Sequence, residues 1–123
     1  MRITAALFFV LLAIFLILFF GNRYVICQHQ QSVIMELKQW EAKYNGVSSM
    51  DEAFDSIDMY EYISGYYLAG EGGYYCSKEM SLKLESQRKR LLSIIIKELE
   101  GYTGKKYGSD LQKWKQWMKE NGG

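Results

Sequence analysis

The chain has 123 residues, with 15 lysines and arginines against 14 aspartates and glutamates, which gives a formal net charge of +1. This length leaves room for one membrane segment and one small domain, and the near-neutral charge provides no overall field that would attract nucleic acid. The sequence contains no proline, which favours long uninterrupted helices over a turn-rich β fold. We therefore expect an all-α protein that has no nucleic-acid partner.

The first predicted element is a membrane-spanning helix at residues 3–20, ITAALFFVLLAIFLILFF, a run without any charge. A helix of this length rises about 27 Å, close to the hydrocarbon thickness of a bilayer. Arg2 precedes the run, and the polar Asn22 and Arg23 follow it at the level of the lipid headgroups. We expect residues 1–23 to be a retained signal-anchor, with the lipid bilayer as the partner of residues 3–20.

Two alternatives to a retained anchor stay open. A cleaved secretory signal also begins with an apolar run, but that run is usually about 7–15 residues long and ends in a site with small residues. Here Phe19 lies where a small residue should precede cleavage after Gly21, and Ile26 lies where a lipoprotein signal needs a small residue before Cys27. A buried helix of a soluble protein is the other alternative. The length of the run and the poor cleavage sites favour the anchor.

The orientation of the span depends on few charges. Arg2 and the free amino group lie before it and Arg23 lies after it, which slightly favours an amino terminus inside the cell. Residues 24–123 would then form one small helical domain outside the cytoplasm, where thiols can be oxidised. A disulfide between Cys27 and Cys76 and a pair of unrelated thiols are both compatible with the sequence.

The part of the chain after the span predicts a small domain of about four helices. Apolar residues from Val33 to Tyr44 recur at helical spacing until Asn45 and Gly46, and only Gly21 interrupts the chain back to the span. This first soluble helix can therefore continue from the anchor as one rod, and its apolar stripe needs a partner.

The second and third helices flank the glycine-rich stretch GEGG at residues 70–73. Ser49 and Glu52 match a capping box before the second helix, whose apolar face extends to Leu68. The third and longer helix follows Ser77 and ends near 101–104. Residues 51–61 carry acids and no base, whereas residues 78–119 are predominantly basic, so the two helices attract each other weakly. An acidic docking face is the alternative interpretation.

The sequence contains only weak matches to phosphate-binding, metal-binding and catalytic motifs. The segment GYTGKK at residues 101–106 fails the spacing of a phosphate-binding loop. His29 is the single histidine, and with Cys27 and Cys76 it supplies at most three ligands from distant parts of the chain. We expect no catalytic residue, no metal and no cofactor, and therefore not an enzyme.

Four tyrosines surround the GEGG stretch, namely Tyr66, Tyr67, Tyr74 and Tyr75. Tyrosine combines apolar area with a polar tip that is useful in binding, but small helical domains also use it as core. Both core packing and a partner-binding surface remain open for these residues.

The last element is a short helix near the carboxyl end. Ser109 and Gln112 match a capping box, which predicts a helix from about Asp110. We expect Trp114 and Trp117, with Tyr107 beside them, to close the core structurally. The lysines of the preceding turn, Lys105 and Lys106, are then dispensable surface residues.

The residues TGKKYGSD at 103–110, followed by Trp114 and Trp117, resemble the terminal segment after the last helical repeat of bacterial HEAT-repeat proteins. The resemblance covers about residues 88–118. Leu111 and Met118 depart from that pattern, since proline and tryptophan are frequent there. A full array is excluded by length, because a solenoid needs several repeats. The resemblance implies one HEAT-like helix pair with a terminal tryptophan helix, acting as a scaffold without catalysis.

These observations favour a single-pass, membrane-anchored helical module that binds an unidentified protein partner through its second and third helices. The alternative is an extracytoplasmic domain that binds a small molecule or glycan in a tyrosine-rich pocket near Tyr66 to Tyr75. A filled core with a flat exposed face favours the first function, and a closed pocket lined by the tyrosines favours the second.

Overall fold

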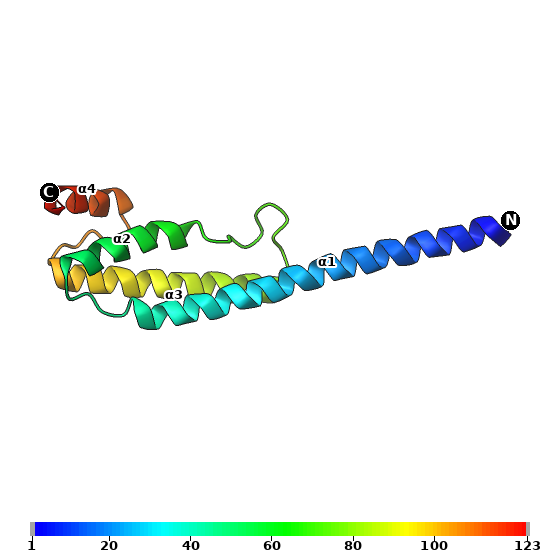
Figure 1. Ribbon diagram of the computed structural model, residues 1–123, viewed down its shortest axis with the longest axis horizontal. Coiled ribbons are helices and arrows are strands. Elements are labelled where there is room, and N and C mark those ends of the chain that lie inside the picture. The colour runs from blue at the N-terminus through cyan, green and yellow to red at the C-terminus, as the bar shows by residue number, and fades with distance from the viewer. Residues whose placement is uncertain (1, 123) are drawn as a thin grey trace.

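The computed structural model describes residues 2–122, which form four helices and no strand. The expectation of an all-α fold is therefore confirmed. Helix α1 (Arg2–Lys43) is one unbroken rod whose amino-terminal half projects away from the rest of the protein (Figure 1). The rod prediction is also confirmed, because Gly21 does not interrupt the helix.

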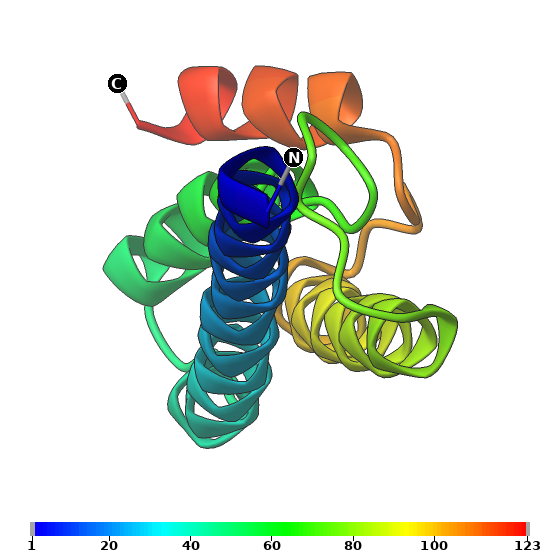
Figure 2. The same ribbon diagram turned by 90° about the vertical axis from the view of Figure 1, so that its right-hand side faces the viewer.

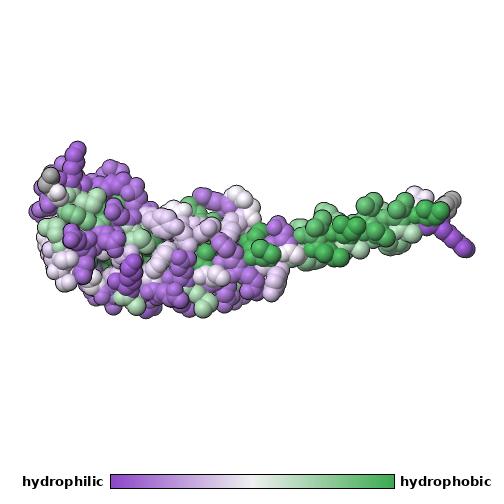
Figure 3. Space-filling model, in the orientation of Figure 1, coloured by the Kyte–Doolittle hydropathy of each residue, from purple (hydrophilic) through white to green (hydrophobic). Residues whose placement is uncertain are grey.

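The projecting half of α1 is long and apolar enough to cross a membrane. The most apolar part of this helix has a mean hydropathy of 3.1, and no residue of it is buried inside the protein. Figure 3 shows this half as a continuous hydrophobic rod attached to a largely hydrophilic body. The segment is therefore not the core helix of a folded domain in this structure.

The other half of α1 belongs to a small helical bundle with α2 (Met50–Ser64), α3 (Lys78–Thr103) and α4 (Leu111–Asn121). Helices α1 and α3 pack along each other, α2 packs on α3, and α4 packs on α2 (Figure 2). The apolar stripe of α1, with Val33 and Leu37, is buried by these contacts. The partner that this stripe required is therefore provided by the same chain. The core contains Val33, Leu37, Tyr44, Ala53, Ile57, Tyr60, Ile63, Leu84, Leu91, Ile95, Leu99, Trp114 and Trp117.

Helix α2 begins as the sequence predicts but ends earlier. The Ser49 side chain accepts a hydrogen bond from the Glu52 amide at 3.2 Å, and the Glu52 carboxylate accepts one from the Ser48 amide at 2.7 Å. This second bond lowers the pKa of Glu52. The predicted extension of the helical face to Leu68 is wrong, because the helix ends at Ser64 and Gly65 caps it.

Helix α4 is capped by Asp110, which corrects the capping box predicted at Ser109. The Asp110 carboxylate accepts the Lys113 amide at 3.2 Å, so Ser109 lies one position too early to cap the helix. The Ser109 carbonyl instead accepts a hydrogen bond from the Tyr60 hydroxyl at 3.3 Å. This contact ties the start of α4 to α2.

The two tryptophans of α4 face the bundle. Trp114 is 1% exposed, its indole N–H donates to the Gly108 carbonyl at 2.8 Å, and its ring meets the Tyr107 ring edge-on at 4.9 Å. Trp117 packs edge-on against Phe54 of α2. The turn that carries Lys105 and Lys106 begins at Gly104, which has a φ of +72°, and both lysines are exposed. This turn redirects the chain so that the indole rings reach the core.

Candidate functional site: an aromatic face beside helix α1

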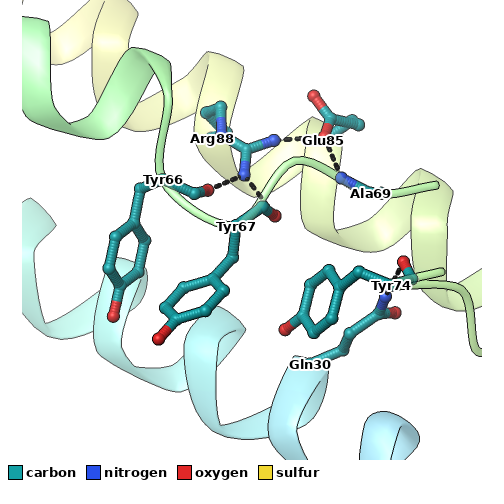
Figure 4. Close-up of polar contacts among 7 residues, drawn as sticks. All are labelled: Gln30, Tyr66, Tyr67, Ala69, Tyr74, Glu85 and Arg88. Carbon is teal, nitrogen blue, oxygen red and sulfur yellow. Dashed lines mark hydrogen bonds and ion pairs between the residues drawn. The ribbon is translucent and has the colours of Figure 1, made fainter. Parts of the chain in front are cut away.

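The connection between α2 and α3, residues 65–77, runs back beside α1 and carries a row of tyrosines. The rings of Tyr66, Tyr67 and Tyr74 lie side by side and project toward α1 (Figure 4). The Tyr66 and Tyr67 centroids are 4.6 Å apart, and those of Tyr67 and Tyr74 are 5.5 Å apart. The rings therefore pack on one another as a layer.

Further aromatic side chains extend this row at both ends. The His29 ring of α1 lies 4.6 Å from Tyr67, and the Trp40 ring, three turns further along the same helix, lies 5.3 Å from Tyr66. Tyr62 at the end of α2 completes the row, 5.1 Å from Tyr66. We call this surface the aromatic face; it consists of His29, Trp40, Tyr62, Tyr66, Tyr67 and Tyr74.

The aromatic face is partly open to solvent. Tyr62 and Tyr67 are 55% and 45% exposed, whereas Tyr66 and Tyr74 are half-buried. The Tyr66 hydroxyl donates to the Glu36 carboxylate at 2.6 Å, and the Tyr74 hydroxyl lies 2.8 Å from the His29 Nδ1 atom. Tyr62 and Tyr67 are therefore accessible to a partner, while the hydroxyls of Tyr66 and Tyr74 are held by contacts with α1.

A buried arginine fixes the first part of the connection. Arg88 of α3 is only 3% exposed, and its guanidinium donates hydrogen bonds to the backbone carbonyls of Tyr66 and Tyr67 (Figure 4). It also pairs with Glu85, which accepts the Ala69 amide at 3.4 Å. Tyr67 has a φ of +44°, a conformation that is uncommon outside glycine, and these bonds hold it there.

Two contacts with α1 fix the second part of the connection. The Gln30 side chain is fully buried and donates to the Tyr74 carbonyl at 2.9 Å. Cys27 and Cys76 form a disulfide, so the end of the connection is bonded covalently to α1. The sequence left this pairing open, and the structure brings the two cysteines together.

Burial changes the acidity of the two tied tyrosines. Burial raises the pKa of Tyr74 to about 12. Burial, reinforced by the hydrogen bond to the Glu36 carboxylate, raises the pKa of Tyr66 well above its usual value. Both hydroxyls therefore stay protonated and available as donors across the physiological range.

The remaining predicted site residues lie elsewhere. Tyr75 leaves the row and is 47% exposed beside Arg23 of α1. Within residues 2–122, no group of three histidine, cysteine, aspartate or glutamate side chains gathers as metal ligands. The Cys27 thiol is consumed by the disulfide, so it cannot join His29 as a ligand or nucleophile.

Sequence reasoning missed Arg88 and Gln30, although each left a signal. Arg88 occupies an apolar position of α3, between Leu84 and Leu91 at helical spacing, and Gln30 similarly precedes Val33. When periodicity assigns a polar residue to the core, its side chain is either buried with a hydrogen-bond partner or turned out to solvent.

Comparison of the chain with protein-family models, with curated proteins and with solved structures gives no match.

Proposed function

We propose that the protein is a single-pass membrane-anchored module that binds a protein partner through its aromatic face and has no catalytic activity. The observation that carries the proposal is a row of tyrosines, two of them half-exposed, on a connection that buried groups hold in place. Tyrosine and tryptophan dominate the binding energy of protein interfaces, and a rigid ring loses little conformational entropy when it is covered.

The fixed backbone supports binding of a preformed surface. Arg88, Gln30 and the disulfide hold the connection from both sides. The connection is therefore already ordered before a partner binds, and binding costs little conformational entropy. The packed rings favour a protein surface over a small ligand, because a small molecule needs concave walls to be buried. We therefore propose that the partner binds mainly to α1 and the connection, whereas the sequence favoured the second and third helices.

We place the helical domain outside the cytoplasm. The disulfide between Cys27 and Cys76 supports this orientation, since disulfides persist in oxidising compartments. The charges around the apolar run favour it as well. A reagent that reacts with thiols but cannot cross membranes should find no free thiol unless a reductant is added first. Free thiols that become reactive only after the membrane is broken would reverse the orientation.

We further propose that α2 and α3 are a degenerate HEAT-like pair and that α4 is its terminal cap. The support is local. α2 packs on α3, Gly104 ends α3 in a left-handed conformation, and Trp114 binds the carbonyl of Gly108 in the turn. Such pairs act as scaffolds through helix surfaces, which agrees with a binding function.

Photocrosslinking in intact cells tests the binding proposal. A photoreactive phenylalanine analogue is placed at Tyr67 or Tyr62, both half-exposed in the aromatic face. The control position is Tyr102, which is 37% exposed on the last turn of α3 and outside that face. We expect one discrete protein adduct from the two face positions and none from the control. Each adduct is identified by mass spectrometry.

Three outcomes would contradict the proposal. Adducts with lipid alone would make the face a membrane-contacting surface. The same protein adduct from Tyr102 would show unspecific proximity. An adduct that persists unchanged in a Trp40→Ala variant, which removes the ring packed against Tyr62 and Tyr66, would show that the captured protein binds elsewhere.

A further inference from the structure

A second feature lies where the apolar run of α1 ends. A cleft of about 200 Å³ opens between α1 and the connection, away from the aromatic face. Its α1 side consists of Phe19, Asn22, Arg23 and Ile26, and its other side of Gly73 and Tyr75. The cleft therefore combines apolar side chains with the Arg23 cation, the Asn22 amide and the Tyr75 phenol.

Arg23 is held at this cleft by the connection. Its Nε–H donates to the Cys76 carbonyl at 2.8 Å, and its guanidinium carbon lies 5.8 Å from the centre of the Tyr75 ring. Within residues 2–122, its two terminal nitrogens donate no hydrogen bond. A guanidinium has five N–H donors, so four remain for a ligand. Because Cys76 is bonded to Cys27, the anchoring carbonyl is itself fixed.

The height of Arg23 matches that of lipid phosphate groups. Arg23 follows Phe20 by three residues, which is a rise of about 4.5 Å beyond the end of the apolar run. The headgroup layer adds about 5–8 Å on each side of the hydrocarbon core. Arg23 and Tyr75 thus lie within the layer that contains the phosphates.

We propose that this cleft binds the phosphate of a phospholipid headgroup, with the Arg23 guanidinium as the bidentate donor. Phe19 then contacts the apolar part of the same lipid, which a free phosphate ion lacks, and Tyr75 covers the headgroup from the connection. This proposal rests on the membrane anchoring in the proposed function. It adds a defined lipid site that couples the anchor to the disulfide-bonded connection.

The test uses the purified full chain in micelles of an uncharged sugar detergent. Dihexanoylphosphatidylglycerol is titrated in, and NMR follows the Arg23 Nε–H and the amides of Gly73 and Tyr75. We expect a saturable shift of these three signals. Inorganic phosphate is the second probe and should bind about tenfold or more weakly, because it has no apolar part to contact Phe19.

Two substitutions link the shift to the guanidinium. Arg23→Gln should weaken lipid binding about tenfold or more, since it removes charge-assisted hydrogen bonds. Arg23→Lys keeps the charge without the planar fork and should weaken it less. Arg90→Gln removes an exposed arginine of α3 that pairs with Glu41 and should leave binding unchanged. The intact mass of each variant shows whether the disulfide has formed.

The proposal is overturned by any of three results. They are the absence of a saturable shift, equal affinity for inorganic phosphate, and unaltered lipid binding in a folded Arg23→Gln variant. If Arg23→Gln does not fold, Arg23→Lys and the comparison of the two probes still decide the matter. A different measurement shows whether the proposed membrane anchoring fails. A mature chain that lacks residues 1–20 in cells would remove the anchor, while this titration still shows whether the cleft binds lipid.

Discussion

Replacing Arg88 by methionine tests whether a buried charge holds the aromatic face in place. Methionine keeps the length and apolar contacts of the arginine stem but cannot donate hydrogen bonds. The variant therefore loses the bonds to the Tyr66 and Tyr67 carbonyls and the ion pair with Glu85. The connection should then detach from α3 between residues 66 and 69.

The size of the effect follows from the burial of each partner. Two hydrogen bonds from a charged donor contribute about 3–6 kcal/mol together. The cost of keeping the guanidinium out of water, several kcal/mol, offsets part of this. Tyr67 is exposed and its carbonyl can bind water, and the Glu85 side chain is 38% exposed, so neither is stranded. We expect Arg88→Met to lower the free energy of unfolding by about 2–4 kcal/mol.

Urea unfolding of the full chain in non-ionic micelles measures this change. All three tryptophans lie outside the apolar run, so their fluorescence reports the helical domain alone. Arg90→Met is the matched control on the same helix, since the Arg90 side chain is 71% exposed and pairs with Glu41 at 3.0 Å. Arg90 itself is exposed, and the Glu41 carboxylate, which is 20% exposed, keeps a hydrogen bond from the Gln87 side chain. The pair should therefore contribute about 0–1 kcal/mol, and the control should unfold close to the parent.

Amide hydrogen exchange gives a second, local measurement. In the Arg88→Met variant, the amides of residues 66–75 should exchange faster than in the parent, even under conditions where the helices stay protected. The reasoning is refuted if Arg88→Met and Arg90→Met unfold at the same urea concentration and the connection exchanges as slowly as before. The aromatic face would then be held by ring packing, the Gln30 hydrogen bond and the disulfide, without a contribution from Arg88.

Three further predictions concern the rest of the domain. Cys76→Ser opens a disulfide that closes a sequence separation of 49 residues, and it should cost about 2–4 kcal/mol in the same urea assay; an unchanged midpoint would contradict this. Trp114→Ala should cost about 3–5 kcal/mol, whereas Lys105→Ala combined with Lys106→Ala should stay within about 0.5 kcal/mol; a Trp114→Ala variant that unfolds like the parent would show that this ring does not close the core. Because burial raises the pKa of Tyr74 to about 12 from an unfolded value near 10, its contribution to stability is present below about pH 10 and is lost as the pH rises toward 12. Thermal unfolding across that range should show the decline, and a constant melting temperature would exclude it.

The helices were predictable because local signals decide them. The absence of proline and the single Gly21 between the apolar run and the domain indicate one continuous rod, and Ser49 marks the start of α2. The sequence predicts the cap of α4 one residue too early, because Ser109 and Asp110 are both good capping residues and local sequence does not distinguish which side chain accepts from the first-turn amides. Such errors of one position are typical of helix ends.

The aromatic face was only partly predictable, because its geometry depends on contacts between distant residues. The clustering of Tyr66, Tyr67 and Tyr74 in the sequence indicates a candidate binding surface. It does not indicate Trp40, which packs against Tyr66 from α1. The Arg88 guanidinium reaches carbonyls 21 and 22 residues away, and no local pattern encodes that reach. Its place in the apolar stripe of α3 was the available clue.

The continuity of α1 sets where the proposed surface can act. His29 and Trp40 follow Phe20 by 9 and 20 residues on one helix, so the aromatic face begins about 14 Å and ends about 30 Å beyond the apolar run. A helix tilt of about 20° lowers these heights by only about 6%. No flexible linker separates the anchor from the domain, so the face cannot search a wide volume. The partner that fits this geometry presents its own surface within about 30 Å of the bilayer, as another membrane protein does.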